Sequence, residues 1–265
     1  NAYHLYKEQP RTVGKTMDAM KGSYLGPEYA QDDIESRLKA SGARFDVLSE
    51  DDAVAQTADA LADEKAVGWF QGRMEFGPRV LGGRSILGDP RSATMQKTLN
   101  LRVKYRESFR PFAPSVLRED ISDWFEIASD SPYMLMVAPV VEKRRLAMTE
   151  DEQKLFGIEK LNVPRSDIPA VTHVDYSARI QTVHAETNPR YHALIKAFKE
   201  RTGCPVVVNT SFNVRGEPIV CTPEDAFRCF MGSDIEVLVI GNCFMKKEDQ
   251  DPALKLDYKN AFDLD

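Results

Sequence analysis

Several segments of this chain are apolar on both faces of an extended strand, and they constrain the fold more than any other feature. The clearest are AVGWFQ (66–71), PVVVN (205–209) and IEVLVI (235–240). Between them lie helical patterns such as 51–64, which begins at a capping box of Ser49 and Asp52. Strands buried on both faces require helices above and below their sheet. We therefore predict an α/β (mixed α+β) protein with an open twisted sheet flanked by helices.

The remaining pattern completes this alternation. A helix is predicted at 189–201, where Asn188 is the cap, Pro189 opens the first turn and Gly203 follows the end. Residues 142–170 are charged and contain proline, so we expect an exposed excursion with one short helix. Further helices are expected at 32–40, 95–103, 121–127 and 223–231, and further strands at 44–48, 112–117, 133–141 and 178–183.

The ends of the chain suggest how it is organised. The 265 residues allow a sizeable core without disulfide or metal support. Residues 1–30 are weakly periodic, and the chain starts at Asn1 without an initiator Met. We expect 1–30 to be a linker or lead-in from a missing N-terminal domain, 31–246 to be the folded domain and 247–265 to be a C-terminal tail.

Composition excludes several classes of protein. The four cysteines have irregular spacing, as expected of reduced thiols in a cytoplasmic protein. The four histidines match no metal-ligand spacing, so we expect no metal site made by this chain alone. The longest apolar run, 134–141, is far too short to cross a membrane. A net charge of −6 makes general nucleic-acid binding unlikely as a function.

The charge is unevenly distributed along the chain. Between Gly72 and Arg118 there are ten basic and three acidic residues, an excess of seven positive charges in a chain whose net charge is −6. The rest of the chain therefore carries −13. This segregation predicts a basic pocket in an acidic body.

The segment GRMEFGPRVLGGRSILGDPR (72–91) is the first candidate anion site. It holds five glycines and four arginines in twenty residues, directly after a buried strand. Glycines expose backbone N–H groups, and arginines such as Arg79 and Arg84 fit phosphate oxygens bidentately. The segment is neither a Walker A loop nor a G-x-G-x-x-G motif. The alternative is a glycine-rich turn with solvated arginines.

Two further segments carry candidate ligand groups. In KYRESFRPFAPSV (104–116), Lys104, Arg106 and Arg110 lie close in sequence, although cations at a helix end are favourable without any ligand. In VVVNTSFNVRGEPIV (206–220), Asn209 and Ser211 follow a buried strand, where ligands of α/β proteins bind. There the alternative is a polar turn bonded to its own backbone.

One arginine interrupts a strand pattern. Arg179 lies in SARIQTV (177–183), which otherwise alternates as a strand. Such a side chain either faces solvent or reaches into a site, and the sequence leaves both possibilities open.

Three long segments together resemble one family. GRMEFGPRVLGGRSILGDPR (72–91), RESFRPFAPSVL (106–117) and NTSFNVRGEPIVCTPEDAFRCF (209–230) resemble the C-terminal domain of the NodU/CmcH family of carbamoyltransferases. The resemblance runs from about Tyr24 to Met245, nearly the whole chain. It departs from the family at Val80, where G-P-R is usually followed by Ala.

The resemblance implies a fold and a reaction. The fold would be YrdC-like, an open twisted sheet with helices. The reaction would form carbamoyl-adenylate from carbamoyl phosphate and ATP with Mg, releasing phosphate and pyrophosphate. An N-terminal ASKHA-type domain of the full-length protein, with its own metal that this chain does not bind, would pass the carbamoyl group to an acceptor hydroxyl. Family acceptors include nodulation-factor sugars and antibiotics.

The resemblance also implies roles for single residues. Lys104 and Arg110 match a K-x5-R pair that holds carbamoyl phosphate, and they are the expected catalytic residues. The expected nucleotide- and phosphate-binding residues are Arg79, Arg84, Arg179, Asn209 and Ser211. No nucleophilic side chain is required. Two other functions stay open: an RNA-binding module that uses the basic segment, and a regulatory nucleotide-binding domain without turnover.

Overall fold

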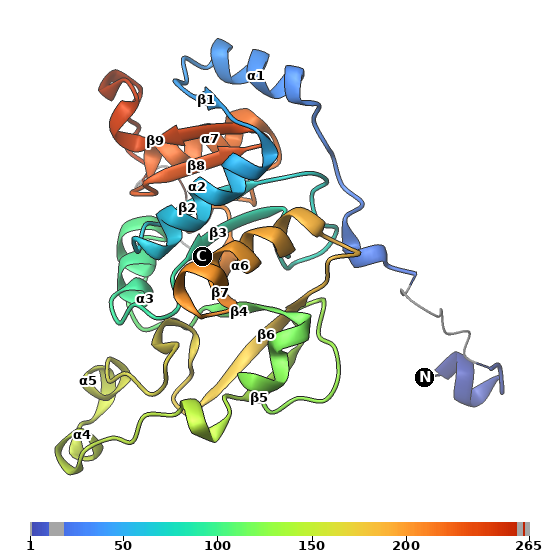
Figure 1. Ribbon diagram of the computed structural model, residues 1–265, viewed down its shortest axis with the longest axis vertical. Coiled ribbons are helices and arrows are strands. Elements are labelled where there is room, and N and C mark those ends of the chain that lie inside the picture. Colours follow the sequence, from blue (N-terminus) through green and yellow to red (C-terminus); the bar gives the residue numbers. More distant parts are fainter. Residues whose placement is uncertain (1, 11–18, 259–261, 263–265) are drawn as a thin grey trace.

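A single mixed sheet of nine strands forms the centre of the protein (Figure 1). The structure is a computed structural model that describes residues 2–10, 19–258 and 262. The strand order is β1-β9-β8-β2-β3-β7-β4-β6-β5, with β2/β8 and β4/β6 parallel and the other neighbours antiparallel. The strands are β1 Asp46–Val47, β2 Val67–Phe70, β3 Arg84–Gly88, β4 Ala113–Leu117, β5 Met136–Pro139, β6 Ser177–Val183, β7 Val206–Ser211, β8 Val237–Ile240 and β9 Cys243–Lys246.

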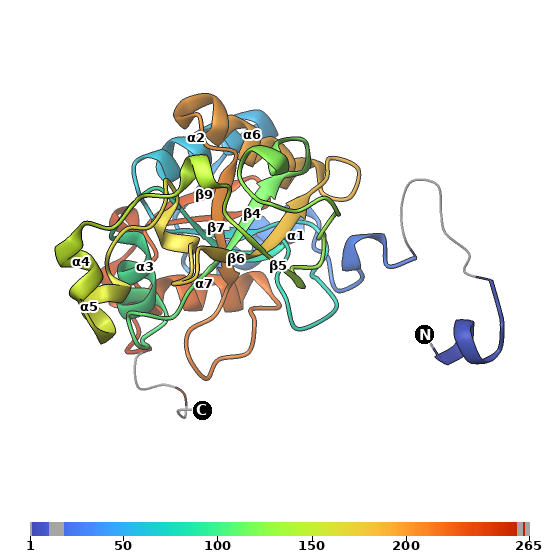
Figure 2. The ribbon, with the colours of Figure 1, turned by 90° about the horizontal axis from the view of Figure 1, so that it is seen from below.

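Helices cover both faces of this sheet, as Figure 2 shows. Helices α2 and α6 pack together on one face, and α3 and α7 lie on the opposite face. Helix α1 packs against α7, whereas α4 and α5 lie at the side of the molecule. The helices are α1 Gln31–Ala40, α2 Glu50–Ala62, α3 Met95–Thr98, α4 Glu150–Lys154, α5 Gly157–Leu161, α6 Pro189–Thr202 and α7 Pro223–Gly232. The predicted mixed α/β architecture is confirmed.

The predicted helix caps are present because they depend only on local sequence. The Ser49 hydroxyl accepts a hydrogen bond from the Asp52 N–H at 3.1 Å at the start of α2. The Asn188 side chain caps α6 in the same way, and Gly203 ends that helix with a φ of 74°. This is the left-handed conformation that glycine adopts without strain.

The structure corrects several predicted elements. Residues 84–88, expected to belong to the anion-binding loop, form the central strand β3, and β9 was not predicted at all. The helix expected at 121–127 is a 3-10 turn over Arg118–Asp123, and the helix at 95–103 changes to a π turn after Thr98. The strands expected at 133–141 and 44–48 shorten to β5 and β1.

The centre of the sheet is closely packed around large aromatic side chains. Trp69 and Phe70 of β2 are almost completely buried, and so is Phe212, which follows β7. A Cβ atom at Gly68 would lie 2.7 Å from Cζ of Phe212, so only glycine fits at this point of the strand. The ends of β2, β3 and β7 are therefore fixed in position, and the loops that follow them are built on a rigid base.

Candidate active site

The loop between β2 and β3 is organised by one buried carboxylate. Oε1 of Glu75 accepts hydrogen bonds from the N–H groups of Leu81 and Gly83, both at 2.6 Å. Gly82 has a φ of 102°, and a Cβ atom there would lie 2.2 Å from the ring of Tyr191. The N–H of Gly83, one of the glycine N–H groups that we expected to be exposed to an anion, donates to Glu75 instead. The glycines thus serve to fold the loop tightly.

Arg84 is a structural centre of the same loop. Its side chain is fully buried and its guanidinium lies 3.5 Å over the ring of Phe70. Burial lowers its pKa to about 10. Its four terminal N–H groups donate to backbone carbonyl oxygens at 2.9–3.1 Å, those of Gln71, Gly72, Gly83 and Pro27. The structure therefore does not bring Arg84 to the cavity described next, where we expected it to bind phosphate.

Three arginines from distant parts of the chain line one cavity of about 170 Å³. Arg79 comes from the β2–β3 loop, Arg106 from the segment before β4, and Arg179 from β6. The end of β7 forms the polar wall with Asn209 and Ser211. We call this cavity the cation pocket; its other lining residues are Pro78, Val80, Pro111, Phe112, Ala113, Met134 and Thr210.

The electrostatics of the cation pocket favour an anion. Burial and the nearby Arg79 lower the pKa of Arg179. Burial and Arg110 lower the pKa of Arg106 to about 10, which still leaves it charged at neutral pH. Among the residues that the structure describes, no acidic side chain lines the pocket. Glu107 offsets part of the repulsion on Arg106, and an anion in the pocket would reduce the repulsion further.

Lys104 lies buried directly behind the polar wall. Its ammonium donates to the carbonyl oxygen of Ser211 and to Oγ of the same residue at 3.2 Å. It also contacts the carbonyl oxygen of Asn213 at 2.9 Å and Oδ1 at 2.8 Å. Burial, followed by Arg106, lowers the pKa of Lys104 to about 7. The predicted residues Lys104 and Ser211 are thus in direct contact.

The predicted pair of Lys104 and Arg110 is not brought together in the cavity. Arg110 is about half exposed and its Nε lies 3.1 Å from Oε2 of Glu107. Arg106, which the sequence analysis noted without assigning it to the site, lines the cation pocket in its place. Its Nε donates to Oδ1 of Asn100 at 2.7 Å. The sequence offered only the basic cluster 104–110 as a signal, and the cluster does not show which cation faces inward.

Asn209 joins three strands beneath the pocket. Its amide nitrogen donates to Oε1 of Gln181 at 2.8 Å, and the hydroxyl of Ser115 donates to the same oxygen at 2.6 Å. Oδ1 of Asn209 is buried and has no hydrogen-bond partner in the described protein. A buried acceptor without a partner is costly, so a ligand donor would be favourable here.

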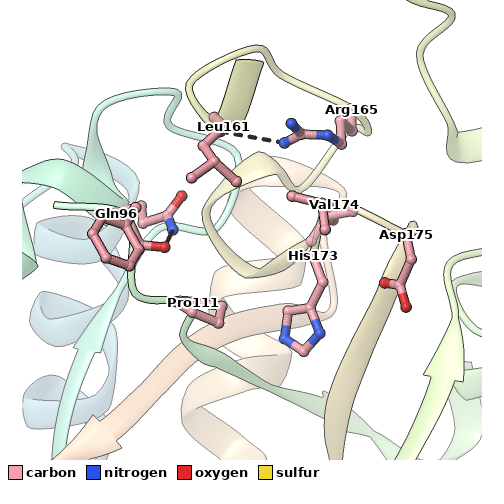
Figure 3. A pocket seen from close by; sticks show the side chains of 9 residues that line it. Gln96, Pro111, Leu161, Arg165, His173, Val174 and Asp175 are labelled. Atoms are coloured by element: carbon pink, nitrogen blue, oxygen red, sulfur yellow. Dashed lines mark hydrogen bonds between the residues drawn. The ribbon is translucent and has the colours of Figure 1, made fainter. Parts of the chain in front are cut away.

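A second cavity, of about 360 Å³, adjoins the cation pocket, because Pro111 lines both. Figure 3 shows Gln96 and Pro111 on one side and His173, Val174 and Asp175 on the other, with Leu161 above them. Burial lowers the pKa of His173, which is therefore neutral at physiological pH. We call this the adjoining cavity; its remaining lining residues are Phe109, Arg165 and Thr172.

Comparison with known proteins shows which family the sequence belongs to. The family model described as carbamoyltransferase C-terminus matches residues 58–247. This range includes all lining residues of both cavities. The chain belongs to the carbamoyltransferase C-terminal family. The family resemblance carried by the three sequence segments is thereby confirmed.

Several longer proteins are similar to this chain in sequence. The uncharacterized protein sll1178 of Synechocystis is 57% identical over 100% of this chain and 43% of its own length. The nodulation protein NolNO of Sinorhizobium fredii is 42% identical over 86% of this chain and 31% of its own. The 3'-hydroxymethylcephem-O-carbamoyltransferase of Streptomyces clavuligerus is 33% identical over 84% and 37%. The chain thus spans less than half the length of these relatives.

A solved structure of full-length HypF in its phosphate- and nucleotide-bound form is 16% identical, with a TM-score of 0.48 over 73% of this chain and 25% of that one. The described residues contain no helix long and apolar enough to cross a membrane, and no group of three or more His, Cys, Asp or Glu side chains placed to hold a metal ion.

Proposed function

We propose that the chain activates carbamoyl phosphate with ATP to form carbamoyl-adenylate in the cation pocket. The observation that carries this proposal is the convergence of Arg79, Arg106 and Arg179 on one cavity backed by Lys104, in a member of a carbamoyltransferase family. Several cations around one polar cavity suit the chemistry of phosphoryl groups, which requires positioning and charge stabilisation rather than a nucleophile.

The proposed reaction has two steps. Water first cleaves carbamoyl phosphate to carbamate and inorganic phosphate. A carbamate oxygen then attacks the α-phosphorus of ATP, the bond to the β-phosphate oxygen breaks, and pyrophosphate leaves. Charge on the transferred and leaving oxygens would be stabilised by Arg79, Arg106 and Arg179. Lys104 would exchange one of its contacts with the 211–213 segment for a ligand oxygen, with Ser211 beside it.

Asn209 is proposed to recognise the carbamoyl group. Its unpartnered Oδ1 is a hydrogen-bond acceptor, and the carbamoyl NH₂ is a donor that phosphate and bicarbonate lack. This single polar contact would distinguish carbamoyl phosphate from anions of similar size. Arg110 does not line the cation pocket, so we propose that it contacts the phosphate of carbamoyl phosphate only as the substrate enters the pocket.

The two cavities together have the dimensions of a nucleotide site. The cation pocket, at about 170 Å³, is smaller than the 300–1,000 Å³ usual for drug-sized ligands, whereas the adjoining cavity falls within that range. We place the ATP phosphates in the former and the nucleoside in the latter. The ring of Phe109 is 42% exposed and offers a face for the base. Mg²⁺ would be held by phosphate oxygens and water, since no described carboxylate lines the cation pocket.

Delivery of the carbamoyl group is proposed to need sequence beyond this chain. Because the relatives are more than twice as long, we propose that an N-terminal domain of the full-length protein transfers the group to an acceptor hydroxyl. We also propose a cytoplasmic location, because all four cysteines are free thiols and three of them are buried.

The test is pyrophosphate release from ATP with and without carbamoyl phosphate. We expect release only when both substrates are present. Equal release without carbamoyl phosphate would refute the proposal, and ATP binding without any release would indicate a regulatory domain. Arg118→Ala is the control for Arg179→Ala, because Arg118 forms an ion pair with Asp130 and does not line the cation pocket.

A second measurement tests whether the ATP phosphates bind in the cation pocket and the nucleoside in the adjoining cavity. Phe109→Ala should weaken ATP binding and leave the binding of tripolyphosphate unchanged, because tripolyphosphate has no base. Arg179→Ala should weaken the binding of both. If Phe109→Ala weakens both equally, the nucleoside does not occupy the adjoining cavity.

A further inference from the structure

The segment after the last strand sends one tyrosine back into the protein. Tyr258 is only 5% exposed, although it lies beyond the end of the family match at residue 247. Its ring packs on α7, where a Cβ atom at Gly232 would lie 2.3 Å from Cγ of Tyr258. Its hydroxyl donates to Oε1 of Glu217 at 2.6 Å and accepts from Nε of Arg228 at 3.2 Å. A buried hydroxyl with two charged partners is a specific contact rather than general packing.

Glu217 carries this contact into the loop after β7. Its Oε2 accepts from the N–H of Val214 at 2.9 Å, and its backbone carbonyl accepts from Nδ2 of Asn213 at 2.7 Å. Asn213 in turn accepts from the Lys104 ammonium through Oδ1 and from the Ser211 hydroxyl at 2.7 Å. A continuous set of hydrogen bonds therefore joins the C-terminal segment to the wall of the cation pocket.

We propose that Tyr258 is a positioning residue: through Glu217 and Asn213 it holds Lys104 and Ser211 in the geometry that binds carbamoyl phosphate. The proposal rests on the function proposed for the cation pocket. It extends the site to Tyr258, which lines neither the cation pocket nor the adjoining cavity. A buried network of this kind fixes one arrangement when each member has its partner.

Glu217 has an additional electrostatic effect. Three ionisable groups act on the Lys104 ammonium: Arg106 disfavours its charged form, whereas Glu217 and Cys229 favour it. Glu217 also raises the pKa of the buried Cys229 thiol, so the carboxylate is the source of negative charge in this region. The hydrogen-bonded set of Tyr258, Glu217 and Asn213, which we call the relay, would thus fix the position of Lys104 and favour its protonated form.

The first experiment observes Lys104 without any substrate. The pKa of Lys104 is measured in the full chain by NMR titration of lysines labelled at Cε, with Lys104→Met used to assign the signal. Glu217→Gln removes the negative charge and should lower this pKa. An unchanged pKa overturns the electrostatic part of the proposal, whether or not carbamoyl phosphate binds.

The second experiment measures carbamoyl phosphate affinity by calorimetry. Tyr258→Phe keeps the ring on Gly232 but removes the hydroxyl, and should weaken binding roughly 2- to 12-fold, which corresponds to a net hydrogen bond of about 0.5–1.5 kcal/mol. In an Asn213→Ala background the same change should have little further effect, because the path is already broken. Equal losses in the two backgrounds, or no loss in either, would overturn the relay.

The matched control is Gln250→Ala. Gln250 is also a buried residue of the C-terminal segment, and its side chain bonds to the backbone of Arg44 rather than to the Tyr258–Glu217–Asn213 relay. This variant should lower stability and leave carbamoyl phosphate affinity unchanged. A loss of affinity equal to that of Tyr258→Phe would assign both effects to general destabilisation. If wild-type protein does not bind carbamoyl phosphate, the proposed function fails, and the lysine titration still decides the electrostatic part of the present proposal.

Discussion

The protonation of Lys104 should make carbamoyl phosphate binding strongly pH-dependent. Its pKa of about 7 lies far below the usual value for lysine because the side chain is buried, with Arg106 adding to the effect. If only the ammonium form binds the anion, the competent fraction falls from a half at pH 7.0 to about 3% at pH 8.5, so affinity should fall roughly 16-fold. Arg106, with a pKa of about 10, stays charged and His173 stays neutral across this range.

The stability of the free protein should change in the opposite direction. The unfolded chain holds the lysine proton up to its ordinary pKa of about 10.4, whereas the folded chain releases it near 7. The unfolded state therefore binds more protons between these values, and the contribution of Lys104 to folding stability rises as pH rises from about 7 to about 10. As pH rises above about 7, affinity for carbamoyl phosphate should therefore fall while the contribution of Lys104 to stability rises. General unfolding at high pH would instead lower both.

Calorimetry in buffers of different ionisation enthalpy is the decisive assay. At pH 8.0, binding of carbamoyl phosphate should take up close to one proton per site, because the bound anion restores the ammonium form. Lys104→Met has similar length and no charge, so its affinity should be lower and nearly constant from pH 7.0 to 8.5. A pH-independent affinity in wild type, or the same slope in Lys104→Met, would refute the role assigned to this proton.

Four other substitutions test the site and its support. Arg179→Ala should slow pyrophosphate formation by roughly 10²–10³-fold in a quenched-flow assay while Arg118→Ala does not; equal effects would remove Arg179 from the pocket chemistry. Glu75→Gln should cost about 1.5–3 kcal/mol in urea denaturation because the carboxylate accepts from several loop N–H groups, and unchanged stability would contradict that role. Gly82→Ala should destabilise by at least about 1–3 kcal/mol through contact with the Tyr191 ring, and a wild-type denaturation midpoint would show that the ring moves aside. Asn188→Ala should cost about 1 kcal/mol through loss of the α6 cap, and Asn188→Ser should recover most of it.

Sequence reasoning succeeded where the deciding interactions are local. The caps of α2 and α6 each lie within three residues of the groups that they satisfy, so a short segment contains all the information. β3 was missed because its burial depends on a remote partner: Leu87 pairs with Asn209 of β7. Glycines on both sides and Arg84 at its start made this strand look like a loop.

The candidate site shows the same limit. Arg79, Arg179, Asn209 and Ser211 were named from the sequence and the family resemblance, and the fold brings them to one cavity. Arg84 and Arg106 could not be sorted in advance, because both are arginines in basic, glycine- or proline-containing segments. What separates them is the set of backbone carbonyls around Arg84, which exists only after Pro27 and the β2–β3 loop have come together.

The placement of charge links folding to function in this protein. The arginines of the candidate site and its loop fall into two kinds, which the sequence alone does not distinguish. The four terminal N–H groups of Arg84 donate to backbone carbonyl oxygens, whereas the exposed Arg79 and the half-buried Arg179 line a cavity in which the described residues place no carboxylate. The first arrangement stabilises the loop, and the second leaves like charges close together in a cavity that an anion would suit. In the proposed function, part of the binding energy for that anion would come from reducing this repulsion.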